Sequence, residues 1–517
     1  MKFLKGITPR EYQQKIFETC VKKNCLVVLP TGIGKTLIAL MLTIKRMQEF
    51  PGEKVVFLAP TKPLAEQQMN YFKKHLPELF GEINLFTGKV KAEQREKIWK
   101  TADIIFSTPQ CVANDLRKNL YSLQDVCLLI EDEAHRCIKN YDYNYIAKKY
   151  AEHAKNQRIL GMTASPGSES AKIKEVCKNL SIEEVELRTR ISDDVKEYLQ
   201  DLEFEKIIVE LPKEFEEMRN ILLRIFNEYA EELKSRKILF GPSTKTELIA
   251  LQKRISGILL RGNKNFNYMI GASVCAQAIK IQHALELLET QTLLSFNKYL
   301  KELFSQAEKR KSKGVIKLVS NQDFNFIYMR SNELLAKSKE HPKLEKLKEI
   351  IEKEISKNSK VKIIVFTQFR DSAESISKKL NSLKNINAKV FVGQAKKNNS
   401  GLSQKEQKKI IDDFSSGKIN VLCATSIAEE GLDIPEVNSV IFYEPIPSAI
   451  RAIQRAGRTA RLMKGKLIML ITKKTRDETF YYVSRSREKK MHKAIDKIKE
   501  DLSNSKEYKK EKQKKLL

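Results

Sequence analysis

Hydrophobic residues in the first 185 positions fall into short continuous runs, and amphipathic stretches such as Thr36–Phe50 separate these runs. A continuous apolar run of this length is typical of a strand that is buried on both faces. Strands that alternate with helices predict a parallel sheet covered by helices. The predicted strands are Cys25–Leu29, Val55–Leu58, Asp103–Phe106, Cys127–Ile130 and Arg158–Gly161. We therefore expect residues 1–185 to form an α/β domain.

The same alternation returns in residues 341–475, which predicts a second parallel-sheet domain in tandem with the first. Its predicted strands are Lys362–Phe366, Ala388–Phe391, Val421–Ala424, Ser439–Tyr443 and Gly465–Ile471. In residues 186–340 the strand signal fades and heptad-like patterns appear, as in Glu214–Leu233 and Gln277–Leu288. We expect a helical insert there. Residues 476–517 are rich in Lys and Glu with few apolar positions, which predicts a basic charged tail, either a solvated helix or a disordered segment.

The charge balance favours a polyanionic partner. The chain has 517 residues, and 95 Lys and Arg against 65 Asp and Glu give a formal net charge of +30. Nucleic acid is the commonest partner for an excess of this size. On charge alone, a basic protein without such a partner is equally compatible with the sequence.

The eight cysteines are dispersed along the chain and form no C-x-x-C pair, so a zinc site is not expected. This pattern favours reduced thiols that serve as small core residues. No apolar run approaches the roughly 18 residues that a membrane span needs, and Met1–Gly6 lacks the apolar stretch of a signal peptide. We expect a cytoplasmic protein, associated with the nucleoid or, in a eukaryote, with the nucleus.

A glycine-rich segment follows the first predicted strand and begins the next helix, which is the context that a phosphate-binding loop requires. Its residues are Leu29, Pro30, Thr31, Gly32, Ile33, Gly34, Lys35 and Thr36. We expect Lys35 to reach the β- and γ-phosphates of ATP and the Thr36 hydroxyl to bind Mg²⁺. The match to G-x-x-x-x-G-K-[ST] is incomplete, because Leu29 stands at the first glycine. The alternative is a plain glycine turn with a surface lysine.

Two adjacent carboxylates directly follow the apolar strand that ends near Ile130. We expect Asp132 to hold Mg²⁺ through water and Glu133 to orient and deprotonate the attacking water, with His135 also in the catalytic set. Taken alone, this segment is equally compatible with a solvated loop. The phosphate loop about a hundred residues earlier favours the catalytic interpretation.

The third candidate element lies in the second predicted domain, where residues 454–461 read Q-R-A-G-R-T-A-R. Arg458 and Arg461 are three positions apart and so share one face of a helix. Such arginines can stabilise charge on a γ-phosphoryl group in transfer. If the two domains face each other, they would complete the site only when the cleft closes. The alternative is a basic helix that binds phosphate without specificity.

These three motifs, in this order, resemble the superfamily 2 helicases of the DEAH-box kind. Further blocks agree with the resemblance: Pro9–Gln13, Ala59–Leu64, Thr108–Gln110, Thr163–Ser165, Val365–Gln368 and Ala424–Asp433. The resemblance implies two RecA-like domains, with ATP and Mg²⁺ bound between them. It places Arg10, Gln13, Gly431 and Asp433 at the nucleotide, Gln13 being the residue that reads adenine. It also places Gln454 among the catalytic residues.

The finer resemblance is to the branch-remodelling helicases of the Hef and Fanconi-anaemia M type. It is carried by Thr108–Leu116, Asp132–Arg136, Gly161–Gly167 and, within the insert, His283–Gln291. One departure is Ala460, where the family usually has glycine. A nuclease signature of the form E-R-K-x-x-x-D is not found, so nuclease activity is not implied. The sequence does not tell whether a separate nuclease or a sliding clamp is a partner.

The resemblance implies an ATP-dependent DNA helicase or translocase that acts on branched DNA. Nucleic-acid contacts are expected at Thr61, Thr108, Thr367 and Thr425, although each threonine is equally compatible with a helix cap. In the insert, Arg254 and Arg261 share one helix face beside the apolar stripe of Ile255, Ile258 and Leu259. We expect these arginines to bind duplex phosphates near a branch, the alternative being an ordinary solvated face. The rival functions are an RNA helicase of the same superfamily and an ATP-independent nucleic-acid scaffold.

Overall fold

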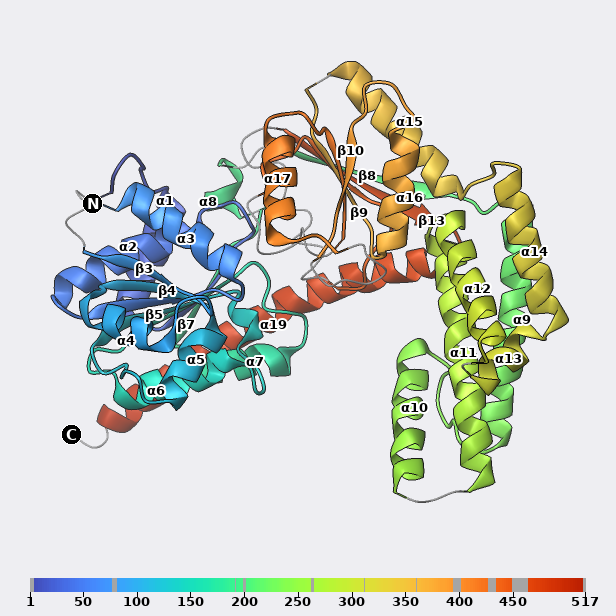
Figure 1. Cartoon of the computed structure of the whole chain (residues 1–517). Coiled ribbons are helices and arrows are strands. Elements are labelled where there is room, and N and C mark those ends of the chain that lie inside the picture. The colour runs from blue at the N-terminus through green and yellow to red at the C-terminus, as the bar shows by residue number, and fades with distance from the viewer. Residues whose placement is uncertain are drawn as a thin grey trace.

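In the computed structural model the chain forms two parallel-sheet domains, a helical bundle and a long C-terminal helix (Figure 1). The structure describes residues 4–76, 81–190, 192–198, 201–261, 265–310, 312–358, 360–393, 401–425, 434–448 and 464–514, with side chains as far as residue 502. Within these ranges we find no helix with both the length and the apolar character that a membrane crossing requires. The predicted α/β fold, with two sheets and helices between them, is confirmed.

The first sheet has seven parallel strands in the order β3-β4-β2-β5-β6-β1-β7. They are β1 (Cys25–Val28), β2 (Lys54–Leu58), β3 (Ile83–Phe86), β4 (Ile104–Ser107), β5 (Val126–Asp132), β6 (Ile159–Thr163) and β7 (Glu184–Leu187). Strand β6 lies between β1 and β5 and pairs in parallel with both. The segments that follow these three strands therefore meet at one edge of the sheet, where ligands bind in open α/β folds.

Helices cover both faces of the first sheet. Helices α1 (Glu11–Lys22), α2 (Lys35–Glu49) and α3 (Lys62–His75) pack on one face, and α4 (Ala92–Thr101), α5 (Pro109–Arg117), α6 (Asp142–His153) and α7 (Ser170–Asn179) pack on the other. The short helix α8 (Asp193–Lys196) adds Val195 to the core beneath α1. All eight cysteines of the chain are buried and free, as predicted for core residues.

The second sheet has six parallel strands in the order β10-β11-β9-β12-β13-β8. They are β8 (Leu202–Val209), β9 (Ile363–Phe366), β10 (Ala388–Phe391), β11 (Val421–Ala424), β12 (Ser439–Phe442) and β13 (Gly465–Thr472). Its core lies against α15 (Pro342–Lys357) and α16 (Arg370–Leu380) on one face and α17 (Gln404–Ser415) on the other.

Strand β8 corrects the predicted boundaries of the insert. Residues 186–340 were expected to be helical, but β7 and α8 complete the first domain, and β8 pairs along its whole length with β13 as the edge of the second sheet. An edge strand buries only part of its surface, and Phe204 and Ile208 are exposed here. The apolar run is therefore weaker than that of a central strand, and local pattern does not reveal it.

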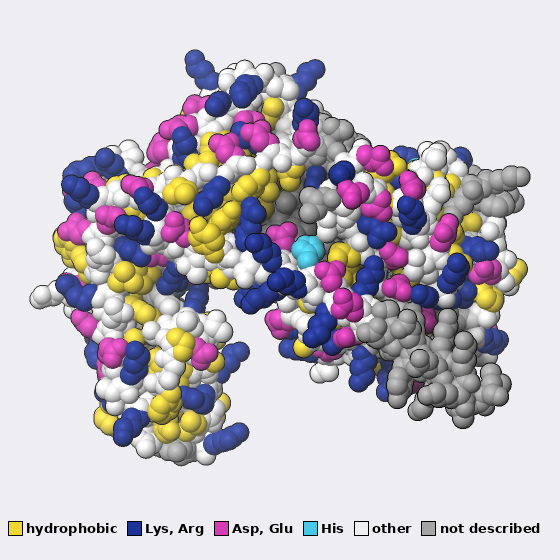
Figure 2. All heavy atoms as spheres, turned by 180° about the vertical axis from the view of Figure 1, so that it is seen from behind, with side chains coloured by type: hydrophobic (Ala, Val, Ile, Leu, Met, Phe, Trp, Pro, Cys, Tyr) yellow, Lys and Arg dark blue, Asp and Glu magenta, His cyan; other side chains and the backbone are white. Residues whose placement is uncertain are grey.

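The bundle comprises α9 (Lys213–Ser235), α10 (Lys245–Leu260), α11 (Phe266–Thr290), α12 (Leu293–Glu308), α13 (Lys313–Val319) and α14 (Gln322–Ala336). These helices bury a hydrophobic core of their own. Figure 1 shows the bundle projecting from the second sheet domain, away from the first. In the view from behind, an open notch separates the bundle from the first domain, and Lys and Arg side chains border it (Figure 2).

Helix α19 (Arg476–Lys514) corrects the prediction of a solvated tail. It runs from the end of the second sheet back along the first domain (Figure 1), and there Met491, Ala494, Ile495 and Ile498 enter the core. These residues recur every three or four positions, so they form one narrow stripe on a helix. The charged residues around the stripe dominate the composition, which is why the segment reads as polar.

Candidate ATP-hydrolysis site

The glycine-rich segment connects β1 with the first turn of α2. Its residues are Leu29, Pro30, Thr31, Gly32, Ile33, Gly34, Lys35 and Thr36. Gly34 has φ +82°, a conformation that favours glycine, and a Cβ there would displace the side-chain amide of Gln13. The Lys35 ammonium donates to the carbonyl oxygens of Leu29 at 2.9 Å and Pro30 at 3.4 Å. It thus lies across the loop at the positive end of the α2 dipole, where anions bind.

Side chains at the start of α1 form hydrogen bonds with this loop. The Gln13 side-chain amide donates to the carbonyl oxygens of Ile33 and Gly34, each at 3.4 Å, and its own oxygen accepts from the Arg10 backbone N–H at 2.8 Å. The Tyr12 hydroxyl donates to the Ile33 carbonyl at 2.6 Å. The structure therefore brings the predicted residues Arg10 and Gln13 to the phosphate loop. That they contact adenine stays a prediction.

The predicted acidic pair stands at the end of β5, and β6 lies between this strand and β1, which leads into the loop. Asp132 is 5% exposed and Glu133 is 8% exposed. The Asp132 carboxylate accepts hydrogen bonds from the Gln68 side-chain amide at 3.1 Å and from the Glu133 backbone N–H at 3.0 Å. The Tyr143 hydroxyl donates to the Asp132 carbonyl at 2.7 Å. Neither Gln68 nor Tyr143 was among the predicted site residues, because each reaches the site from a distant helix.

Glu133 has a left-handed backbone, with φ +52°. A residue with a side chain pays for this conformation, and such residues gather at functional sites. The turn sets one Glu133 carboxylate oxygen 3.3 Å from Nδ1 of His135. The same ring nitrogen lies 3.1 Å from the Thr163 hydroxyl at the end of β6. The structure thus joins the predicted residues Glu133 and His135 directly.

The two carboxylates differ in their electrostatic surroundings. Burial and the neighbouring charge of Glu133 raise the pKa of the Asp132 carboxyl. Burial also raises the pKa of Glu133, but the hydrogen bond from His135 and the charges of His135, Lys35 and Arg136 outweigh it and lower this pKa. The two adjacent buried carboxylates are oxygen donors of the kind that Mg²⁺ prefers. A cation here would offset the cost that burial imposes on Asp132.

A chain of hydrogen bonds continues from Thr163 toward the second domain. The Thr163 hydroxyl donates to the Ser165 carbonyl at 3.0 Å and accepts from the Ser165 backbone N–H at 3.1 Å. The Ser165 hydroxyl donates to the sulfur of Met491 on α19 at 2.9 Å. Met491 was not predicted to belong to the site, because the sequence shows it only as an apolar residue in a charged segment.

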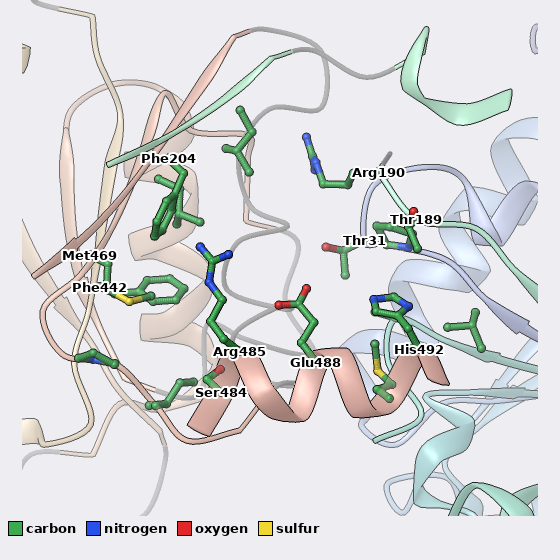
Figure 3. A pocket seen from close by; sticks show the side chains of 18 of the residues that line it. Thr31, Thr189, Arg190, Phe204, Phe442, Met469, Ser484, Arg485, Glu488 and His492 are labelled. Carbon is green, nitrogen blue, oxygen red and sulfur yellow. The ribbon is translucent and has the colours of Figure 1, made fainter. Parts of the chain in front are cut away.

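Two cavities lie between the sheet domains. One, of about 800 Å³, extends from Thr36 and α3 to α17 and has four lysines in its walls: Lys62, Lys74, Lys405 and Lys408. The other, of about 430 Å³, has Thr31 of the phosphate loop on one side and Phe204, Phe442 and Met469 of the second sheet on the other. Figure 3 shows α19 along this second cavity, where it carries the lining residues Arg485, Glu488 and His492. The phosphate loop therefore faces the second domain across a cleft.

The residues predicted to reach across this cleft from the second domain lie outside the described residues. They are Gly431, Asp433, Gln454, Arg458 and Arg461. Their roles stay predictions.

Three family models match the chain in succession: "DEAD/DEAH box helicase" at residues 10–173, "Putative ATP-dependent RNA helicase, helical bundle" at 214–341 and "Helicase conserved C-terminal domain" at 342–463. Among solved structures, the chain is similar to the Hef helicase domain of Pyrococcus furiosus, with 41% identity and a TM-score of 0.70. This match covers 92% of the present chain and 98% of the other. The chain belongs to the Hef family of superfamily 2 helicases.

Curated relatives of this Hef-family chain carry both RNA and DNA helicase names. A "Putative ATP-dependent RNA helicase" of Methanocaldococcus jannaschii is 37% identical and matches 95% of this chain and 61% of its own. An "ATP-dependent DNA helicase mph1" of Neurospora crassa is 34% identical over 91% of this chain and 41% of its own. A "Fanconi anemia group M protein homolog" of Mus musculus is 32% identical over 94% of this chain and 26% of its own. The chain thus spans about a quarter to three fifths of the length of these relatives.

The four threonines predicted to contact nucleic acid in this Hef-family chain have different surroundings. Thr61 is exposed and Thr108 is half-buried, and they stand directly before α3 and α5 without capping those helices through their side chains. Thr425 is 7% exposed. Thr367 is fully buried and its hydroxyl donates to the Gln291 side-chain oxygen at 3.2 Å. The prediction for Thr367 is therefore wrong for this conformation, because the hydroxyl is closed off from a strand.

The two arginines predicted in the insert are exposed on α10 and at its end. Ile255 is buried and Ile258 and Leu259 are partly buried, so the predicted apolar stripe packs the helix against the bundle. The Arg254 guanidinium donates to the Ile238 carbonyl at 2.7 Å, which holds it at the surface. Arg261 follows the last turn of α10. That these residues contact nucleic acid stays a prediction.

Proposed function

We propose that this Hef-family chain is an ATP-dependent DNA helicase or translocase that acts on forks and junctions in repair or recombination. One observation carries the catalytic part of the proposal: the buried pair Asp132 and Glu133, oriented by Gln68 and His135, stands at the same edge of the sheet as the phosphate loop with Lys35. A scaffold that does not hydrolyse ATP has no need of two buried carboxylates beside such a loop, since burying them costs stability.

In the proposed mechanism, the loop amides and Lys35 bind the phosphates, and Glu133 takes the proton of the attacking water. The lowered pKa of Glu133 keeps this carboxylate ionised and able to accept the proton. Thr36 and Asp132 would hold Mg²⁺, which would neutralise charge on the phosphates. Arg458 and Arg461 would approach the γ-phosphate from the second domain when the cleft closes. Repeated closing and opening would move the two domains along the strand.

The helical bundle is the element that we propose to select branched DNA. The two sheet domains can grip any strand through its backbone, and such contacts carry no preference for structure or sequence. The bundle projects beyond them and presents Arg254 and Arg261 on its surface. Phosphates of a duplex arm near a branch would meet these cations. The proposed location is the nucleoid or, in a eukaryote, the nucleus.

An RNA helicase of the same superfamily is the second candidate. The relative from Methanocaldococcus jannaschii and the family model that matches the bundle both carry an RNA helicase name. The DNA helicase names of the fungal relatives and the similarity to Hef favour DNA. The motor residues do not separate the two, because they would contact the backbone that both polymers share.

The proposal is tested by measuring phosphate release from ATP in the presence of four nucleic acids. These are a DNA fork, a four-way junction, a plain duplex and a structured RNA. We expect the fork and the junction to stimulate hydrolysis most, and the fork to be unwound only with ATP. Stimulation by RNA above that by every DNA would support the RNA helicase instead. Nucleic-acid binding without any ATP hydrolysis would support the scaffold.

A further inference from the structure

The first residues of helix α19 pack against the second sheet domain and against helix α11 of the bundle. Asp477 and Lys343 form an ion pair of 2.7 Å whose side chains are both fully buried, and Asp477 also accepts from the Thr472 backbone N–H at 3.0 Å. Eight positions further along the helix, roughly two turns, Arg485 lies over the rings of Phe204 and Tyr481, 5.1 and 5.4 Å from their centres. This part of α19 therefore belongs to the second domain.

The next turns of the same helix belong to the first domain. Met491, Ala494, Ile495 and Ile498 are buried in the hydrophobic core that α7 and β7 also form. Arg485 and Met491 are six positions apart, which is roughly 9 Å along a helix. A single uninterrupted helix thus connects the two domains across the cleft, as Figure 3 shows. Met491 is the first of the buried anchors that α19 places in the first domain.

Met491 contacts the chain of hydrogen bonds that leads to the catalytic carboxylate. The Ser165 hydroxyl donates to its sulfur at 2.9 Å, and Ser165 is fully buried. Ser165 and Thr163 bond to each other, and Thr163 lies 3.1 Å from the His135 ring, which orients Glu133. A displacement of α19 at Met491 would therefore change the position of the Glu133 carboxylate, because each group between the two is in direct contact with the next.

We propose that Met491 is a positioning residue that makes the orientation of Glu133 depend on the position of the second domain. When the cleft closes on ATP and a strand, the second domain displaces the start of α19, and the uninterrupted helix transmits this displacement to Met491, which shifts Ser165. Thr163 and His135 follow, since each is hydrogen-bonded to the next. Hydrolysis would then be fast only in the closed arrangement. This inference rests on the proposed function, because it requires that a strand and ATP close the cleft.

The test compares Met491→Leu with Ile498→Leu in the full chain. Both substitutions nearly conserve volume in the same core cluster, and only the first removes the sulfur that accepts from Ser165. We expect Met491→Leu to lower the DNA-stimulated hydrolysis rate about three- to tenfold, the effect of one hydrogen bond, and to lower basal hydrolysis by a distinctly smaller factor. We expect Ile498→Leu to change both rates less than twofold. Thermal unfolding of both variants checks that the core is intact.

Ser165→Ala and the double variant complete the experiment. If Met491 acts through Ser165, the double variant loses no more stimulation than either single variant, because both changes break the same contact. Additive losses would overturn the proposal, as would a parallel fall of basal and stimulated rates in Met491→Leu alone. Wild-type protein that no nucleic acid stimulates would contradict the proposed function itself, and this inference with it.

Discussion

The acidic site of the first domain and the basic surface of the bundle are built in opposite ways. In the first domain, Asp132, Glu133 and Thr163 are buried, and each is held by hydrogen bonds or close polar contacts. On the bundle, Arg254 and Arg261 are exposed, and the first is steadied by one backbone carbonyl. Chemistry requires groups that are already oriented in a water-poor place, whereas recognition of a large polyanion requires cations that the polyanion can reach.

This contrast predicts two classes of variants. A change in the buried site should affect hydrolysis with every nucleic acid, because all of them use the same carboxylates. A change on the bundle surface should affect the choice among nucleic acids and leave the chemistry intact.

Glu133→Gln should abolish ATP turnover and leave ATP binding intact, since the phosphate loop, Thr36 and Asp132 survive while the base is lost. Phosphate release and binding of a fluorescent nucleotide measure the two effects. Glu131→Gln is the matched control. Burial raises the pKa of Glu131 to about 8, so this carboxyl is mostly protonated at pH 7 and glutamine resembles it. Equal inactivity of both variants would show that the strand end, and not the base, had been damaged.

Arg458→Ala should lower strand-stimulated hydrolysis by about three orders of magnitude and change strand affinity little. The reason is that Arg458 is proposed to stabilise charge on the γ-phosphate across the cleft. Steady-state kinetics and fluorescence anisotropy with single-stranded DNA measure the two quantities. Weak binding with preserved hydrolysis would instead identify residues 454–461 as a nucleic-acid-binding helix.

Glu286→Gln should loosen the contact between α10 and α11. Burial raises the pKa of Glu286, but hydrogen bonds from His283 and Lys245 and their charges outweigh it and lower the pKa to about 2. The folded pKa lies below the ordinary value, so the ionised form contributes stability above pH ~4.5 and loses it as pH falls toward 2. At pH 7 we expect a loss of about 1–3 kcal/mol.

Hydrogen exchange of the α10 amides measures this loss, with Glu247→Gln, an exposed glutamate at the start of the same helix, as the control. We expect faster exchange in α10 for Glu286→Gln alone, and unchanged exchange in the first domain. Unchanged α10 exchange would show that the ion pair does not hold the helix in place.

The order of motifs and the strand–helix alternation were enough to predict both sheets and the phosphate loop. The predicted strand at Cys127–Ile130 lies inside β5, and the acidic pair follows it as expected. Such features are local, because an apolar run and the turn after it are neighbours in sequence. The joining of Glu133 to His135 was likewise predictable, since the two residues are two positions apart.

Features that depend on distant segments were not predictable in the same way. Strand β8 joins the second sheet through β13, more than 250 positions later, and its half-exposed pattern gives no sign of that partner. Met491 meets Ser165 across 326 positions. Thr367 shows the converse error: its motif suggested a strand contact, but Gln291 of the bundle buries its hydroxyl. Long-range packing decides these cases, and a local pattern carries no information about it.

The division of labour between the domains is tested most directly with Arg254→Glu and Arg261→Glu combined in one protein. The measurement is the ratio of fork-stimulated to single-strand-stimulated hydrolysis. The matched double variant is Lys301→Glu with Lys309→Glu, which changes one exposed lysine on α12 and one directly after that helix. We predict that the ratio falls toward one while the single-strand rate is kept, and that the salt dependence of fork binding drops by about one log–log unit per lost contact. Equal losses on forks and single strands would contradict the account.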